Sequence, residues 1–497
     1  MQPVQYYQIG GFRAHLRDNS NDALAAKLMG SDGAELVLGI RPCGASYLLL
    51  PKDTFHAMRL GRPRASAWQA HEFESLSPIQ FPTKLDLASK LSMLTSNKKS
   101  TDGKPRDRSK ANTAFTAGGD GLSPAGIARS SFEHQRVFYR LCQSSIEKPN
   151  HYALQLAPWF QDVQIFSFAF NTWASDTRPL DERQAEPRIP DVGWTEFNSP
   201  TDSDDLRAMS TSHYFVEEDR YLSNPRRKKL FLPDISQYAP KESIRTILQE
   251  TFGSMQGQRS IRPKILLVHD QTMALCVLRS FGVDTSAWKT GIKDLLYAQG
   301  ARRTRERDSI SGTKDYKQDR KEEWTRERSR SPRRHSSGVE SRRRPRSPPS
   351  PHHPPPVYIV DVRTMYQTLM QLPFRDDSVL DSAKALNVRD TAPVRGEDDG
   401  VVYEDVDPTS WCAGRESRLL GYMWEDMANS IAIDEQRALR HRFSKEPIED
   451  YGQLAGGHEG DDADPNDILQ PAPYPSNSAS APRPMGMFDS DSEDDDW

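Results

Sequence analysis

Short apolar runs alternate with helical patterns between residues 160 and 435, and this alternation constrains the fold more than any other feature of the chain. VQIFSFAF (163–170), KILLVHD (264–270) and PPVYIVDV (355–362) are typical of buried strands, whereas KESIRTILQETF (241–252) repeats apolar residues at helical spacing. This order predicts an α/β domain with a mixed sheet flanked by helices. The other elements that we expect are strands at 189–197 and 213–219 and helices at 130–145, 273–282, 365–372, 378–386 and 414–433.

A long polar segment interrupts this domain between its fourth and fifth expected strands. Residues 301–350 hold 17 Lys and Arg against 8 Asp and Glu. Only 36% of the 497 residues are hydrophobic, below the roughly 45–50% (a figure that also counts Gly) of a globular chain. Polar chain of this kind cannot offset its ordering entropy by burying apolar surface. We therefore expect long disordered segments, namely a linker (95–128), an Arg/Ser/Pro-rich insert (301–356) and an acidic tail (455–497).

Residues 1–94 have the pattern of a small N-terminal ordered region. ELVLGIRP (35–42) and SYLLLP (46–51) predict a hairpin, and TKLDLASKLSML (83–94) predicts a short helix. The region contains no motif that carries chemistry. We interpret it as a packing module, with a recruitment surface as the alternative.

Two classes of protein are disfavoured by the composition. No run approaches 18 apolar residues, so we expect no transmembrane helix and no membrane partner. Cys43, Cys142, Cys276 and Cys412 are far apart and form no CxxC pair, so we expect neither a disulfide framework nor a cysteine-rich zinc site. The absence of a disulfide framework and of a cysteine-rich zinc site fits a reducing compartment.

The order of the strands and helices resembles the ribonuclease H-like fold of the DEDD 3′–5′ exonuclease superfamily, and more closely the fungal Gfd2-type C-terminal domain. The resemblance rests on IFSFAFNTW followed by IPDVGWTEF, then HYFVEEDRYL, ILLVHD and IVDVRTMY, and it covers about 155–435. It implies one ribonuclease H-like sheet formed by 130–300 and 357–435. Relatives of this domain have been linked to mRNA export, so the resemblance also implies a role near RNA.

The superfamily hydrolyses phosphodiesters with two metal ions, which carboxylates hold because Mg²⁺ prefers oxygen ligands. Its pattern is D-x-E on the first strand, an Asp after a His-Asn pair, and H-x4-D on the last helix. Carried over position by position, these slots fall on Ala169 and Asn171, on Ala274, and on Trp411 and Glu416. Only Glu416 keeps a carboxylate, and Trp411 cannot serve as a general base. The resemblance therefore implies a degenerate exonuclease without catalytic residues.

A shifted alignment recruits Asp162, Asp176, Asp270, Asp361 and Glu416 as ligands instead. Asp270, Asp361 and Glu416 are the candidates for any residual metal site, although no D-x-E survives on the first strand. We expect no cofactor, and Mg²⁺ or Mn²⁺ only if the protein is an active exonuclease. Asp361 is predicted to cap the helix that starts near Thr364.

Two further residue types at the expected cleft have more than one interpretation. His269 is either a remnant of the site or a hydrogen-bonded histidine at a strand end. Trp159, Trp173, Trp194 and Trp411 could stack on bases. Because they lie beside apolar runs, we interpret these tryptophans as core residues.

The insert resembles the RS-type segments of RNA-processing factors, since Arg-Ser and Ser-Pro dipeptides alternate in RSRSPRRHSS and SRRRPRSPP. Arginines neutralise nucleic-acid phosphates and give salt-dependent, weakly selective binding. Ser331 and Ser347 precede proline, and phosphorylation there would weaken the RNA contact. A solvated loop without a partner is the alternative. The arginines predicted to bind nucleic acid are Arg328, Arg330, Arg333, Arg334, Arg342, Arg343, Arg344 and Arg346.

Two other charged segments suggest partners. PRRKK (225–229) resembles a nuclear-localisation patch or is a basic turn, and it favours a nuclear or nucleocytoplasmic location. The tail ends in DSDSEDDDW, in which Ser490 and Ser492 have the acidic surroundings that acidophilic kinases prefer. The tail could bind a basic protein partner, or only keep the chain soluble.

The sequence thus favours a catalytically inactive ribonuclease H-like protein that binds RNA or a ribonucleoprotein, with a role in mRNA processing or export. An active metal-dependent 3′–5′ exonuclease is the first alternative. A protein-interaction scaffold without a nucleic-acid role is the second. The lost carboxylates argue against the first alternative, and the arginine-rich insert argues against the second.

Overall fold

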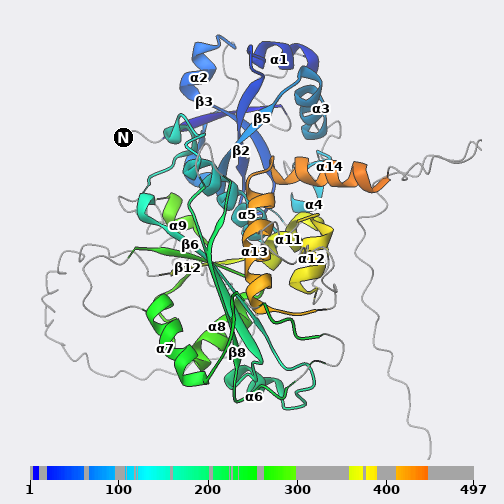
Figure 1. The fold of residues 1–497 in the computed structure, drawn as a ribbon. Helices are drawn as coiled ribbons and strands as arrows, with labels where there is room; N and C mark the ends of the chain where they lie inside the picture. The colour runs from blue at the N-terminus through cyan, green and yellow to red at the C-terminus, as the bar shows by residue number, and fades with distance from the viewer. Residues whose placement is uncertain are drawn as a thin grey trace, which may run out of the picture. The chain divides into compact units, whose positions relative to one another are not determined.

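The fold is described from a computed structural model (Figure 1). The described residues up to Ser444 belong to one compact unit. The insert and the acidic tail lie outside the described residues, as do all of their arginines and serines named above. The structure describes residues 4–445 with gaps at 11–19, 61–65, 96–106, 108, 117–118, 120, 157–159, 201–204, 223, 225–227, 233, 254–261, 298–356, 373–376 and 389–409.

A seven-stranded mixed sheet forms from the predicted α/β region, in the order β11-β12-β10-β6-β7-β8-β9. β6 pairs antiparallel with β7 and parallel with β10, and β12 continues the parallel half, with Ile265 opposite Tyr358. The strand after the insert therefore joins the sheet formed before it, as predicted. The strands are β6 (Gln164–Asn171), β7 (Asp191–Phe197), β8 (Ala208–Val216), β9 (Ser236–Ala239), β10 (Lys264–Val268), β11 (Lys289–Thr290) and β12 (Val357–Asp361).

Helices cover both faces of this sheet, because alternate residues of each strand point to opposite sides. Phe166, Phe168 and Leu266 face one core with α7 and α8. Ile165 and Leu267 face the other core, which five further helices complete. The α/β architecture with a mixed, helix-flanked sheet is confirmed. The helices are α7 (Lys241–Phe252) and α8 (Gln271–Ser280) on the first face, and α5 (Pro124–Cys142), α9 (Lys293–Leu296), α11 (Val362–Met370), α12 (Val379–Ala385) and α13 (Ala413–Ala428) on the second.

The N-terminal region contains a second, antiparallel sheet in the order β4-β1-β3-β2-β5. Its β2–β3 pair is the predicted hairpin, and α3 is the predicted helix. α1 and α3 pack on one face, and α5 packs on the other. Because α5 also packs against α11 and α13, one hydrophobic core runs from this sheet into the α/β region. The elements are β1 (Gln5–Ile9), β2 (Ala34–Ile40), β3 (Ser46–Pro51), β4 (Trp68–Gln69), β5 (Ser75–Phe81), α1 (Asn21–Leu28), α2 (Lys52–Ala57) and α3 (Lys84–Leu94).

Part of the segment expected to be a disordered linker, 95–128, is folded instead. It contains α4 (Thr113–Thr116) and the first turn of α5. The buried Asn112 side chain accepts a hydrogen bond from the Ser46 amide at 2.8 Å and donates one to the Ser46 carbonyl at 2.9 Å. These long-range bonds satisfy a polar side chain that the local composition gave no reason to bury.

The segment expected to be one final helix, 414–433, is two helices, because α13 ends at Ala428 and α14 (Ile433–Lys445) follows. Side chains of α5 hold the turn between them. Arg136 donates to the Ser430 carbonyl at 3.1 Å, and Glu133 accepts from the Ile433 amide at 3.0 Å. The apolar residues in the turn continue the helical pattern of the sequence, which hides the break.

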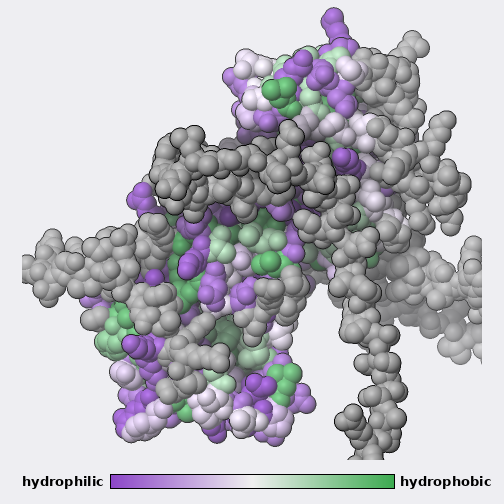
Figure 2. Space-filling model, turned by 90° about the vertical axis from the view of Figure 1, so that its right-hand side faces the viewer, coloured by the Kyte–Doolittle hydropathy of each residue, from purple (hydrophilic) through white to green (hydrophobic). Residues whose placement is uncertain are grey.

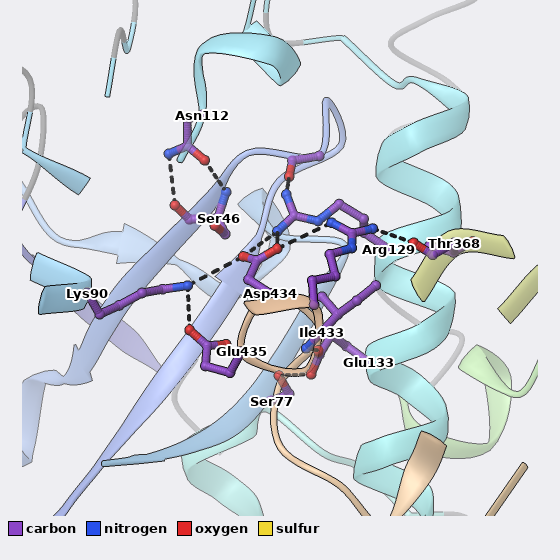
Figure 3. Close-up of polar contacts among 12 residues, drawn as sticks. Ser46, Ser77, Lys90, Asn112, Arg129, Glu133, Thr368, Ile433, Asp434 and Glu435 are labelled. Carbon is purple, nitrogen blue, oxygen red and sulfur yellow. Dashed lines mark hydrogen bonds and ion pairs between the residues drawn. The ribbon is translucent and has the colours of Figure 1, made fainter. Parts of the chain in front are cut away.

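A network of ion pairs connects α14 to both parts of the fold (Figure 3). Lys90 of α3 lies 2.6 Å from Glu435 and 3.4 Å from Asp434. Arg129 of α5 binds the same Asp434 carboxylate. Ion pairs among α3, α5 and α14, of which Arg129 is the most buried member, therefore link the two parts of the fold in addition to the shared core.

The surface viewed in Figure 2 carries small hydrophobic patches separated by hydrophilic side chains. Of the helices that the structure describes, none combines the length and the apolar character needed to cross a membrane.

Candidate functional site

A cleft of about 720 Å³ opens at the carboxyl ends of β6 and β10, where α/β sheets usually bind ligands. The first turn of α13 and the start of α12 close one side. The β6–β7 connection, which includes α6 (Leu180–Ala185), forms another side. Among its lining residues, those with polar or aromatic side chains are Phe168, Phe170, Asn171, Thr172, Trp173, Ser175, Asp176, Arg183, Gln184, Arg188, Asn224, His269, Asp270, Arg363, Asp377, Ser378 and Glu416.

Asn171 and Glu416 meet at the floor of the cleft. Asn171 is the last residue of β6, and Glu416 lies in the first turn of α13. The Asn171 amide nitrogen donates to the Glu416 carboxylate at 3.1 Å, and both residues are buried. A carboxylate that already accepts this hydrogen bond has fewer lone pairs left to bind a cation.

The start of α13 is pressed against the sheet, and this fixes the position of Glu416. A Cβ atom on Gly193 of β7 would lie 2.5 Å from the Gly414 amide nitrogen, so only glycine fits there. The Ser167 hydroxyl of β6 donates to the Ser417 carbonyl at 2.6 Å. The helix therefore cannot rotate Glu416 away from Asn171 without breaking buried contacts.

Asp270 and Asp361 follow the two neighbouring parallel strands β10 and β12, and both cap helices. Asp270 accepts from the Met273 amide at 2.9 Å, and its other oxygen lies 3.2 Å from Arg363. Asp361 accepts from the Thr364 amide at 2.7 Å, which confirms the predicted cap. Burial raises the pKa of Asp361 from its ordinary value.

The family pattern is only partly assembled in space. Ala169, Asn171 and Glu416 line the cleft. Ala274 instead packs in the core beneath α8, and Trp411 is fully buried against Phe215. The spacing of a motif assigns these two slots to the site. Packing of α8 instead turns Ala274 into the core, and the bridge between Trp411 and Lys229 places Trp411 against Phe215.

The candidate metal ligands are similarly divided. Asp270 and Glu416 line the cleft, whereas Asp361 does not. In the part of the chain that the structure describes, no three His, Cys, Asp or Glu side chains lie where they could share one metal ion. Ala169 supplies no oxygen, and the Arg363 guanidinium stands beside Asp270. These residues do not fit the two-cation site of the superfamily.

The β6–β7 connection forms a wall of the cleft whose Trp173 and Asp176 were candidates from the sequence, whereas its arginines Arg183 and Arg188 were not predicted. The Arg188 guanidinium lies 5.2 Å from the Trp173 ring centre, and the Trp173 amide donates to the Arg188 carbonyl at 3.1 Å. Hydrogen bonds from Arg178 hold the pKa of Asp176 at about 2. Arginines in a loop carry no periodicity. Arg363 could have been found, because it directly follows the end of an expected strand.

The four tryptophans differ in their surroundings. Trp194 and Trp411 are buried, and Trp194 stacks on Tyr214. Trp173 lines the cleft and is half-buried, so it is not a core residue. Trp159 lies outside the described residues.

A buried Cys–His–Asp group lies behind the cleft. His213 is 2.8 Å from Asp191 and 3.5 Å from the Cys412 sulfur. Burial raises the pKa of Cys412 to about 12, so the thiolate needed for nucleophilic attack is not formed at neutral pH. Asp191 also accepts from the Ala413 amide at 2.8 Å. The group therefore anchors the start of α13 rather than performing chemistry.

Comparisons with known protein families, with curated proteins and with solved structures found no match for this chain.

Proposed function

We propose that this protein is a catalytically inactive ribonuclease H-like module that binds RNA or a ribonucleoprotein. The observation that carries the proposal is the hydrogen bond between Asn171 and Glu416. In the superfamily pattern these two positions hold oxygen ligands of a metal ion, whereas here one side chain donates an N–H to the other. The cleft lies where the superfamily pattern would place its metal site, but the side chains at these two positions no longer both offer an oxygen ligand.

The strand order supports the resemblance on which this proposal rests. Counted along the chain, the five longer strands β6, β7, β8, β10 and β12 lie in the order third, second, first, fourth, fifth. β6, β7 and β8 are antiparallel neighbours, and β10 and β12 run parallel to β6, so the segments before and after the insert share one sheet, which the resemblance implies. Because the cleft lacks the oxygen ligands of a two-metal site, we propose that no Mg²⁺ or Mn²⁺ cofactor is needed.

The cleft wall offers groups that suit a single-stranded nucleic acid. Arg183 and Arg188 are exposed and can contact phosphates, and Trp173 presents an aromatic ring for a base. The arginine-rich insert would add affinity that does not depend on sequence. A role in mRNA processing or export, in a nuclear or nucleocytoplasmic location, follows from this proposal.

The test has two parts. The purified full-length protein should leave labelled single-stranded RNA and DNA intact with Mg²⁺ or Mn²⁺. It should bind RNA in a fluorescence-anisotropy titration, and Arg188→Ala should weaken that binding by about threefold to tenfold. Arg245→Ala, which removes an exposed arginine of α7 outside the cleft, is the matched control.

Either alternative has a distinct outcome. Metal-dependent exonuclease activity that disappears in Asp270→Ala or Glu416→Ala would establish the active enzyme. No measurable RNA binding by the wild-type protein would leave the protein-interaction scaffold as the better explanation.

A further inference from the structure

Three aromatic rings form a nearly parallel group at the β9 edge of the main sheet, outside the cleft. Phe231 and Tyr238 lie 5.9 Å apart with 16° between their planes. Phe215, on the neighbouring strand β8, is the third ring and lies 6.1 Å from Phe231 and 5.2 Å from Tyr238. Phe215 is buried, whereas Phe231 is 45% and Tyr238 is 53% exposed. Together, Phe231 and Tyr238 are named the aromatic platform below.

The backbone holds both rings of the aromatic platform in place. Tyr238 lies on β9 in register with Phe215 of β8. Phe231 follows Leu230, whose amide donates to the Trp411 carbonyl at 3.1 Å. Aromatic rings whose positions are fixed before a ligand arrives cost little entropy on binding.

Cationic side chains adjoin the aromatic platform. The Lys229 ammonium lies 5.8 Å from the Phe215 ring centre and 5.7 Å from that of Trp411. Lys228 beside it is exposed. Asp234, in the turn between the two rings, is also exposed and offsets part of this charge. Stacking on the rings, more than net charge, would therefore carry the affinity.

The same loop reaches the cleft. Asn224 lines the cleft, where it donates to the Thr172 carbonyl at 3.2 Å and accepts from the Ala174 amide at 2.7 Å. Further along the chain, Lys228 and Lys229 pair with Trp411, and Phe231 follows. One continuous loop thus borders both the cleft and the aromatic platform.

We infer that the aromatic platform is a second binding site, at which unpaired nucleic-acid bases stack on Phe231 and Tyr238. Bases of every kind present a π-face, so the site takes single strands with little sequence preference. The lysines meet the phosphates between stacked bases. This goes beyond the proposed function, which concerns the cleft.

The test compares two labelled single strands of about 12 nucleotides, one of oligouridine and one whose inner positions lack bases. The insert and any other cationic surface contact both strands alike, so the ratio of their Kd values isolates stacking. The full-length wild-type protein should bind oligouridine about tenfold more tightly than the abasic strand. In Phe231→Leu/Tyr238→Leu, which keeps apolar bulk but no rings, the ratio should fall severalfold, and the preference that remains reports stacking on Trp173 of the cleft.

Met209→Ala, which removes an exposed apolar side chain of β8, is the control and should keep the wild-type ratio. Thermal unfolding should show that the double variant remains folded. Equal binding of both strands by the wild type, as expected for a surface that docks a protein, would overturn the inference. So would an unchanged ratio in the double variant. Arg188→Ala, which tests the cleft, should weaken binding of both strands and leave the ratio unchanged.

Discussion

The Arg129 guanidinium of α5 donates hydrogen bonds to both carboxylate oxygens of Asp434 of α14, at 2.8 and 2.7 Å. The Arg129 side chain is 2% exposed and that of Asp434 is 23% exposed. These residues lie 305 positions apart, so their pairing depends on the whole fold. Lys90 of α3 binds the same carboxylate, which makes Asp434 the point where three helices meet.

Asp434→Asn should destabilise the protein by about 3–5 kcal/mol, because it leaves the buried Arg129 guanidinium without its counter-charge. The measurement is the free energy of unfolding in urea. Glu242→Gln breaks an exposed pair with Arg245 on α7 and should cost less than about 1 kcal/mol. Equal losses in the two variants would mean that the Asp434 network contributes no more than a surface pair.

The same network predicts a pH dependence. Burial alone would raise the pKa of Asp434, but Arg129 and Lys90 lower it well below its ordinary value. A lowered folded-state pKa gives stability that is present above the unfolded-state pKa and is lost as pH falls through the folded one. The difference in unfolding free energy between wild type and Asp434→Asn should therefore shrink from about pH 7 to about pH 3. A constant difference would contradict the assignment.

Asp361 allows a test of the helix cap and of burial at the same time. Asp361→Ala removes the acceptor for the Thr364 and Gln271 amides and should cost about 1–3 kcal/mol. Asp361→Asn keeps an acceptor oxygen and should cost less at neutral pH, because burial raises the pKa of the carboxyl and disfavours its charge. Urea unfolding of both variants measures this. A larger loss in Asp361→Asn would show that the carboxylate charge stabilises the fold.

Cys412 should resist alkylation in the native protein. Its thiol is buried and its pKa is raised to about 12 by that burial, so little thiolate forms. Iodoacetamide labelling followed by mass spectrometry should modify Cys276, which is half-buried, well before Cys412. Urea should remove the difference. Rapid native labelling of Cys412 would reopen a nucleophilic role for the group with His213.

The strands could be predicted because each carries its own apolar pattern, as in KILLVHD (264–270). The order of the strands within the sheet was not predicted. The resemblance assigned Asn171 and Glu416 to one site, and the structure brings their side chains together. The pairs that hold the molecule together could not be predicted, because Arg129, Lys90 and Asp434 have no local pattern. Ala274 shows the opposite error, in which a sequence pattern misleads. Motif spacing assigns this residue to the cleft, whereas the packing of α8 buries it in the core.

The aromatic platform could not be predicted from the sequence either. Phe231 and Tyr238 are seven positions apart in the sequence. The pairing of β8 with β9 brings Tyr238 against Phe215, and the bridge between Lys229 and Trp411 brings Phe231 there. PRRKK (225–229) drew attention to this loop as a localisation patch. Its last two lysines instead border the aromatic rings, which gives the basic run a second interpretation.

The insert carries the last prediction, which concerns salt. Deleting residues 301–350 removes all eight arginines assigned to RNA, while β11 and β12, which flank the insert, remain paired in one sheet. Each phosphate contact contributes about 0.7 to the slope of log K against log salt for single strands. The deletion should therefore lower RNA affinity and flatten that slope, as measured by anisotropy at two salt concentrations. Phosphorylation of Ser331 and Ser347 should act in the same direction, because negative charge is added among the arginines.

The RNA binding that remains after the deletion tests the aromatic platform. The protein without residues 301–350 should still prefer oligouridine to the abasic strand, because stacking does not release counterions. An unchanged affinity and an unchanged slope would show that the insert does not bind RNA, and binding would then rest on the cleft and the aromatic platform alone.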